Sequence, residues 1–145
     1  PPAIRAWMDR LTVRHAYDPE TGFIVAKEVI TLPPILAEGP ALDVRLPTWT
    51  PGSYVQQPFD ASLEILSAEL NGSPVPWRKT EKDSWRVEAG AGEITIRYRV
   101  HADRRSVSAS WVSEDYVALN GTSVFLYTDG TRDQLQRLIV TPPPE

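Results

Sequence analysis

Strict alternation of apolar and polar residues constrains the fold of this chain more than any other feature. The clearest case is Glu93–His101, in which every second residue is apolar, from Ile94 to Val100. This period of two is typical of a strand that lies half-buried in an antiparallel sheet. The segment Ala41–Leu46 repeats the pattern. The other predicted strands are Leu11–Tyr17, Phe23–Thr31, Leu63–Leu70, Ser84–Val87, Val107–Val112, Tyr116–Leu119, Ser123–Tyr127 and Arg137–Thr141.

Turn-forming residues separate these segments at short intervals. Asn71-Gly72 is a strong hairpin signal, because both residues tolerate the backbone conformation of a two-residue turn. The chain contains 14 prolines, which is unfavourable for helices, and no window of twelve residues shows a convincing helical stripe. We therefore predict an all-β fold: an antiparallel β-sandwich forming a single domain with little or no helix.

The length and the last residues predict how the chain is divided. A chain of 145 residues fits one domain. It ends in Pro142-Pro143-Pro144-Glu145, and consecutive prolines favour an extended, semi-rigid conformation that is common at domain junctions. We expect residues 1–141 to form the sandwich and residues 142–145 to form a Pro-rich junction to a catalytic domain.

Composition excludes several classes of function. The net charge is -4, with Lys and Arg dispersed among Asp and Glu, so no basic face for nucleic acid is predicted. The chain contains no run of 18 apolar residues, the length at which a segment becomes a candidate for a membrane-spanning helix. Cysteine is absent, which excludes a thiol nucleophile, a disulfide and a thiolate metal site.

The histidines and serines do not form a recognisable catalytic motif. His15 falls on the apolar face of its predicted strand and His101 on the polar face, and neither belongs to a His-Glu-x-x-His helix. We expect one packed and one solvated histidine. Ser53 and Ser123 lack both the Gly-x-Ser-x-Gly turn and a histidine nearby in sequence. We therefore predict no catalytic residue and no metal ligand in this chain.

The five tryptophans could stack on sugar rings or pack inside the sandwich. Trp85 and Trp111 alternate with apolar residues, which favours packing in the core or between the sheets. Trp49 precedes Pro51-Gly52, a pair that suits the centre of a type II turn, so its indole is expected to fold back on its own loop. Packing is therefore preferred to a carbohydrate platform.

Four short motifs occur in a fixed order along the chain. Leu46–Tyr54 reads Leu-Pro-x-Trp-x-Pro-Gly-Ser-Tyr, and a Pro-x-Pro stretch followed by Trp-x-Val lies within Gly72–Val87. Tyr98–Val100 reads Tyr-Arg-Val, and Asn120–Leu126 reads Asn-Gly-Thr-Ser-x-Phe-Leu. Taken together, they resemble the amino-terminal domain of the glycyl aminopeptidase family, a branch of the thermolysin-like zinc metallopeptidases.

The resemblance implies that the chemistry of the parent protein lies outside this chain. In such enzymes a β-rich amino-terminal domain precedes a helical catalytic domain, which binds zinc through His-Glu-x-x-His and a further glutamate. The resemblance therefore implies a non-catalytic accessory domain of a zinc-dependent aminopeptidase. Its partner would be the catalytic domain of the same polypeptide, and it would meet the peptide substrate only indirectly.

Four residues are the candidates for contacts with the catalytic domain or the substrate cleft. They are Trp49, Tyr54, Tyr116 and Asn120. The segments Trp49–Tyr54 and Tyr116–Thr122, the second of which includes the short predicted strand Tyr116–Leu119, are interpreted as elaborate loops, and loops on a rigid scaffold often carry contacts. The alternative is that these residues only brace their own loops. A competing function is a stand-alone, immunoglobulin-like binding module for a glycan, peptide or protein partner, because sandwiches host many functions.

Overall fold

The computed structural model describes residues 11–49, 56–103, 109–131 and 136–142, and their regular structure is almost entirely β-strand. The strands are β1 (Leu11–Asp18), β2 (Phe23–Leu32), β3 (Leu42–Arg45), β4 (Leu63–Leu70), β5 (Ser73–Pro74), β6 (Trp77–Glu81), β7 (Ser84–Val87), β8 (Gly92–His101), β9 (Trp111–Val112), β10 (Val117–Ala118) and β11 (Arg137–Thr141). Short 3-10 helices are η1 (Pro34–Leu36), η2 (Phe59–Ser62), η3 (Gly121–Ser123) and η4 (Asp129–Thr131). The predicted all-β fold with little helix is confirmed.

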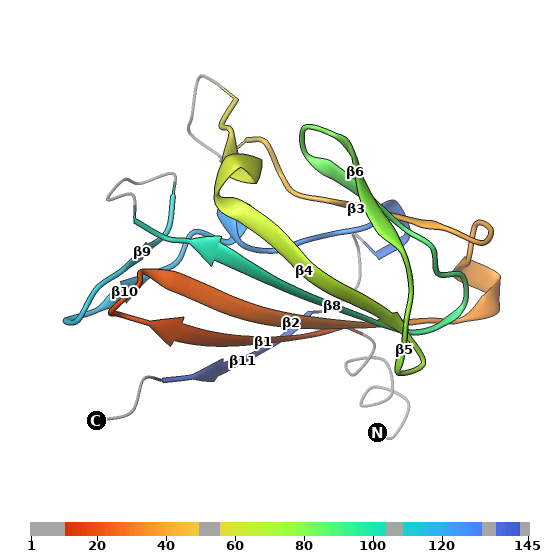
Figure 1. The fold of residues 1–145 in the computed structure, drawn as a ribbon, viewed down its shortest axis with the longest axis horizontal. Coiled ribbons are helices and arrows are strands. Elements are labelled where there is room, and N and C mark those ends of the chain that lie inside the picture. The colour runs from red at the N-terminus through yellow and green to blue at the C-terminus, as the bar shows by residue number, and fades with distance from the viewer. Residues whose placement is uncertain (1–10, 50–55, 104–108, 132–135, 143–145) are drawn as a thin grey trace.

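The strands form one large and two small sheets (Figure 1). The large sheet has the order β11-β1-β2-β8-β4-β5, and its strands pair antiparallel except for β11, which runs parallel to β1. The second sheet has the order β3-β7-β6, and the third pairs β9 with β10. Because β2 and β8 occupy the middle of the large sheet, their side chains form the centre of the core.

The register of the central strands places one continuous face on the inner side of the large sheet. Ala26 of β2 lies opposite His15 of β1 and opposite Tyr98 of β8. Directly opposed residues point to the same face, and so does every second residue after them. The buried apolar residues of this face in β1, β2 and β8 also include Leu11, Val13, Tyr17, Ile24, Ile30, Leu32, Ile94, Ile96 and Val100.

The hairpin between β4 and β5 turns at the predicted Asn71-Gly72. Asn71 has φ 51° and Gly72 has φ 84°, so both residues are left-handed. A two-residue turn with both residues at positive φ matches the right-handed twist of the strands that it joins. The hairpin prediction is therefore confirmed in its backbone conformation.

Strand β6 was not predicted. All five of its residues, Trp77–Glu81, are exposed, so the segment lacks the alternation that identifies a half-buried strand. It exists because it pairs with β7, whose Trp85 and Val87 are buried. Backbone pairing with a neighbouring strand is a tertiary feature that the composition of β6 does not record.

The prediction of a strand over Ser123–Tyr127 is wrong. Asn120 caps the short helix η3, and the chain then passes the core without a sheet partner until Tyr127 forms an isolated bridge with Arg45. Val124 and Leu126 are buried while Phe125 and Tyr127 are only partly so. The alternation is therefore real, but it reports burial of every second side chain, which does not require a hydrogen-bonded neighbour.

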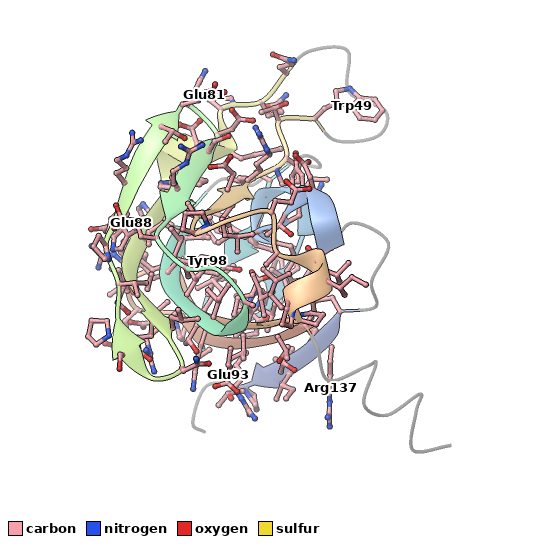
Figure 2. The ribbon with its side chains drawn as sticks, turned by 90° about the vertical axis from the view of Figure 1, so that its right-hand side faces the viewer. Trp49, Glu81, Glu88, Glu93, Tyr98 and Arg137 are labelled. Carbon is pink, nitrogen blue, oxygen red and sulfur yellow. The ribbon has the colours of Figure 1, made fainter. Side chains whose placement is uncertain are left out.

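A buried hydrogen bond joins this segment to the large sheet. The Tyr98 hydroxyl donates to the carbonyl oxygen of Val124 at 2.8 Å, and both residues are fully buried. Tyr98 lies in the interior of the molecule (Figure 2). The core that surrounds it also contains Val44, Leu46, Trp85 and Val87 from the side of the second sheet. The bond therefore fixes the covering segment over the middle of the large sheet.

Replacement of Tyr98 by Phe tests this bond. Tyr98→Phe should lower the free energy of unfolding by about 1–2 kcal/mol, because the buried Val124 carbonyl loses its partner. Tyr17→Phe is the matched control, since Tyr17 is also buried but its hydroxyl has no hydrogen bond among the described residues. Urea denaturation measures both variants. Equal losses would contradict a special role for the Tyr98 bond.

Two ionisable side chains are enclosed in the same core. His15 and Glu28 are each only 1% exposed. Gln136 donates to one Glu28 carboxyl oxygen at 3.2 Å, while the other oxygen and both imidazole nitrogens of His15 have no hydrogen-bond partner among the described residues. The imidazole instead stacks on Phe125 at 5.4 Å between ring centroids. As predicted, His15 is packed and His101 is exposed.

Burial shifts the pKa of both groups toward the neutral form. Removal from water raises the pKa of Glu28 from 4.5 to about 8 and lowers the pKa of His15 from 6.5 to about 4. An ionised carboxylate or imidazolium without a nearby counter-charge is costly in an apolar interior. Both side chains are therefore neutral between about pH 4 and pH 8.

The pH dependence of stability follows from these shifts. Between pH 4.5 and 8 the folded state holds a proton on Glu28 that the unfolded chain has lost, so a rise in pH destabilises the fold. Between pH 4 and 6.5 His15 has the opposite effect, because only the unfolded chain is protonated there. The two effects oppose each other most strongly below pH 6.5, and above it the Glu28 effect increasingly dominates.

We expect the free energy of unfolding to fall by about 1 kcal/mol per pH unit between pH 6.5 and pH 8, because Glu28 and His15 are each only partly titrated at one end of this window. The Glu28→Gln variant keeps the shape of the side chain and removes its proton equilibrium, so it should abolish this fall. Urea denaturation of both proteins at the two ends and at about the middle of this pH window measures the difference. Parallel pH profiles would show that Glu28 does not titrate in this window.

Candidate functional site

Trp49 lies on the loop that follows β3. Its side chain is 50% exposed, and Figure 2 shows the indole projecting at the rim of the molecule, away from Tyr98 in the interior. The amide of Gln57 donates to the carbonyl oxygen of Thr48 at 2.6 Å and closes the base of the loop. The predicted turn at Pro51-Gly52 and the candidate Tyr54 lie outside the described residues.

Tyr116 lies at the turn between β9 and β10, which occupy one end of the molecule (Figure 1). Its backbone N–H bonds to the Ser113 hydroxyl at 3.3 Å, and its carbonyl accepts from the Ser113 amide at 3.0 Å. The Tyr116 side chain is 45% exposed and follows the exposed acids Glu114 and Asp115. The hairpin therefore presents an aromatic ring beside two carboxylates.

Asn120 is a structural brace. Its side-chain oxygen accepts from the amide of Thr122 at 3.2 Å and from the Thr122 hydroxyl at 2.7 Å. Its own amide donates to the Ser110 hydroxyl at 3.0 Å, and its carbonyl accepts from Ser123 at 2.8 Å. These bonds fix the start of η3 against the segment that leads into β9. Of the two readings of Asn120, its hydrogen bonds favour bracing of its own loop.

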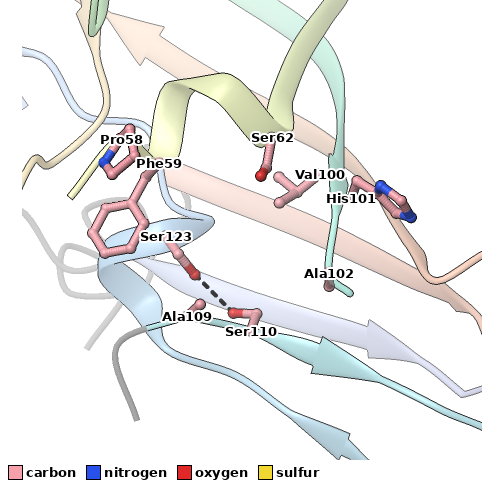
Figure 3. A pocket seen from close by; sticks show the side chains of 9 residues that line it. All are labelled: Pro58, Phe59, Ser62, Val100, His101, Ala102, Ala109, Ser110 and Ser123. Carbon is pink, nitrogen blue, oxygen red and sulfur yellow. Dashed lines mark hydrogen bonds between the residues drawn. The ribbon is translucent and has the colours of Figure 1, made fainter. Parts of the chain in front are cut away.

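A small pocket lies beside this brace (Figure 3). Phe59 and Val100 line one side, and Ser110 and Ser123 line the other, with 2.8 Å between the two hydroxyl oxygens. Its volume is about 20 Å³, enough for a single water molecule. Neither serine was singled out as part of a pocket, because they are 13 residues apart and meet only through the brace.

A wider, polar hollow lies between η1, β3 and η4. It measures about 340 Å³, and Asp43, Arg86 and Asp129 are among its lining residues. The Arg86 guanidinium donates to the Asp43 carboxylate at 3.0 Å, and this hydrogen bond lowers the pKa of Asp43. A carboxylate held in its charged form by arginine is a poor proton acceptor. The hollow therefore shows an ion pair but no acid–base pair.

The two histidines do not meet in a common site. His15 lies on the inner face of β1, whereas His101 is exposed at the end of β8, stacked on Phe23 at 4.7 Å between ring centroids. Within the ranges that the structure describes, no group of three His, Cys, Asp or Glu residues could hold a metal ion. No helix in that part of the chain has the length and apolar character to cross a membrane.

The tryptophans divide between core and surface. Trp85 is 3% exposed, as predicted for core packing, whereas Trp111 is only partly buried. Trp77 and Trp49 are exposed. The prediction of interior packing is therefore confirmed for Trp85, whereas Trp111, in the short pair β9–β10, is partly buried.

Comparison with known proteins identifies the family. The model of the Peptidase M61 N-terminal domain matches residues 24–145. An aminopeptidase N family protein from Idiomarina loihiensis has a similar structure, with a TM-score of 0.83 and 24% identity over 92% of this chain and 22% of that chain. An M1 zinc metallopeptidase from Deinococcus radiodurans is 10% identical, with a TM-score of 0.49, over 92% of this chain and 31% of that chain.

No curated protein sequence matches the chain. The chain spans 22% of the Idiomarina loihiensis protein, so the similarity to that structure concerns one domain of a longer molecule. The family match covers well over half of the 145 residues and agrees with the resemblance carried by the four sequence motifs. The chain belongs to the Peptidase M61 N-terminal domain family.

Proposed function

We propose that the chain is the non-catalytic amino-terminal domain of a zinc-dependent aminopeptidase, that it packs against the catalytic domain of the same polypeptide, and that it walls part of the substrate cleft. The observation that carries this proposal is the family match over residues 24–145. The similar Idiomarina loihiensis protein is much longer than this domain, which leaves ample chain for a catalytic domain there.

In the parent protein, this chain supplies structure and contacts, and the catalytic domain supplies the chemistry. Residues 1–141 form the sandwich, and residues 142–145 form the junction to the catalytic domain. Zinc and the residues that activate water belong to that domain. The candidates of this chain supply aromatic and hydrogen-bonding contacts at the edge of the cleft.

The exposed aromatic side chains support a contact surface on the loops. Trp49 and Tyr116 are each about half exposed, and large aromatic side chains are enriched at protein interfaces. Asn120 contributes indirectly, since it holds the segment next to the β9–β10 hairpin in place. Tyr54 stays a candidate from the sequence alone.

A stand-alone binding module for a glycan, peptide or protein is the second candidate, because the same half-exposed aromatic rings could stack on a ligand. The reading frame beyond Glu145 separates the two functions. A frame that continues into His-Glu-x-x-His and a downstream glutamate supports the peptidase domain. A stop codon directly after Glu145 would favour the binding module.

Aromatic truncations in the whole enzyme test the contact surface. Trp49→Ala and Tyr116→Ala should each lower kcat/KM by roughly three- to tenfold, since an anchoring aromatic contributes about 1 kcal/mol or more at an interface. Trp77→Ala is the matched control, because Trp77 is an exposed tryptophan that lies on strand β6 and belongs to neither loop. Unchanged activity and unchanged melting temperature in both variants would refute the contact surface.

The purified chain itself should hydrolyse no aminoacyl or peptide substrate. The assay compares the chain with the whole enzyme, each with zinc and with a chelator. Hydrolysis that is lost with chelator should occur in the whole enzyme only. Zinc-dependent hydrolysis by the 145-residue chain would show that catalytic residues lie inside it.

A further inference from the structure

Three cations lie in one row across the outer face of the large sheet. Lys27 of β2 is directly opposite Arg14 of β1 on one side and directly opposite Arg97 of β8 on the other. Figure 1 shows these three strands side by side. Like charges directly opposite each other destabilise a sheet. The three cations therefore repel one another, and this repulsion lowers the stability of the sheet unless a counter-charge is present.

Carboxylates compensate only one end of the row. Arg97 pairs with Glu69 at 2.8 Å, and in the next row Arg99 pairs with Glu64 at 2.8 Å. Arg14 and Lys27 form no ion pair among the described residues. The chain carries a net charge of -4, so these two uncompensated cations are a local excess of positive charge on a mildly acidic protein.

An apolar hollow adjoins the row. It measures about 260 Å³, which leaves room for one bulky side chain. Ala16, Val25 and Leu66 line it together with the three cations. Val25 and Leu66 are each 46% exposed, so apolar surface remains open to a ligand. The hollow thus combines an apolar floor with uncompensated positive charge at its rim.

The apolar floor and the two cations together favour a ligand that is both apolar and negatively charged. A carboxylate attached directly to an apolar body would neutralise Arg14 and Lys27 while its apolar part covers Val25 and Leu66. An inorganic anion would leave the hollow empty. A nucleic acid strand would need a longer run of uncompensated cations than two. Peptides that end in an apolar residue and fatty acids both present the required chemistry.

We propose that this outer hollow binds the free carboxyl-terminal end of a peptide whose last side chain is apolar. The choice of a peptide over a fatty acid rests on the proposed function, in which the parent enzyme acts on peptides. The apolar side chain occupies the hollow, and its carboxylate pairs with Arg14 and Lys27. The hollow lies on the outer face of the large sheet, whereas the proposed cleft contacts come from the loops.

The test uses the 145-residue chain and N-acetyl-Ala-Ala-Leu with either a free carboxylate or a carboxamide at its end. Chemical-shift titration should show saturable binding of the acid, with the perturbed amides in β1, β2 and β8. The amide should bind about tenfold more weakly, because it loses the charge-assisted hydrogen bonds. Equal affinity for both peptides, or no binding of the acid, would overturn the proposal.

Variants localise the binding. Arg14→Gln combined with Lys27→Gln should weaken binding of the acid about tenfold, and it should fold at least as stably as the wild type because repulsion is relieved. Leu66→Ser should also weaken binding, through the lost apolar contact. The matched control combines Arg78→Gln with Lys82→Gln, two exposed cations in or next to β6, and should change the affinity less than about twofold. Equal effects of the two double variants would overturn the assigned site.

Octanoate distinguishes the two sources of the ligand. Binding of octanoate at this hollow without binding of the tripeptide acid would overturn the peptide assignment in favour of a fatty acid. The binding experiment and the test of the proposed function can fail independently, because binding of a ligand by the chain does not depend on peptidase activity. A whole enzyme without peptidase activity would refute the proposed function, while binding data on the chain decide the hollow independently.

Discussion

The pairing of β2 with its two neighbours is the constraint on which the rest of the structure depends. Because side chains alternate with a period of two, the register that sets Ala26 opposite His15 and Tyr98 also decides every other inner and outer position of these strands. A slip by one residue would move the apolar face to solvent and turn Lys27 and Arg97 into the core. The core, the cation row and the outer hollow are therefore products of one register.

The same register encloses Glu28 and His15 in the core. Glu28 occupies a position that in β2 is otherwise filled by apolar residues, with Val13 and Ile96 directly opposite. A neutral carboxyl that accepts one hydrogen bond from Gln136 costs less than an ionised one, but it still leaves an oxygen without a partner. The buried carboxyl group of Glu28 thus lowers the stability of the core.

The candidate contacts differ in character once their surroundings are known. Asn120 is engaged by hydrogen bonds that hold η3 and Ser110 together, whereas Trp49 and Tyr116 present half-exposed rings from separate loops. An interface needs both kinds of residue, since exposed anchors act only when their loops are held in place. The candidates thus divide into a bracing residue, Asn120, and two half-exposed rings, a distinction that residue type alone does not reveal.

The sequence alone determined the strands that are half-buried and the turn that joins β4 to β5. In Glu93–His101 the alternation records which side chains leave water, and at Asn71-Gly72 the residue types match the required positive φ. These signals are local, so they can be read without a partner strand. The four motifs likewise predicted the family from residue order.

Only the tertiary structure decided which segments pair and which polar groups meet. Val124 and Leu126 alternate like a strand but have no sheet neighbour, while exposed Trp77–Glu81 becomes β6 because β7 lies beside it. Strand pairing is a contact between two segments, so neither partner encodes it alone. For the same reason, the row formed by Arg14, Lys27 and Arg97 existed only once three strands were in register.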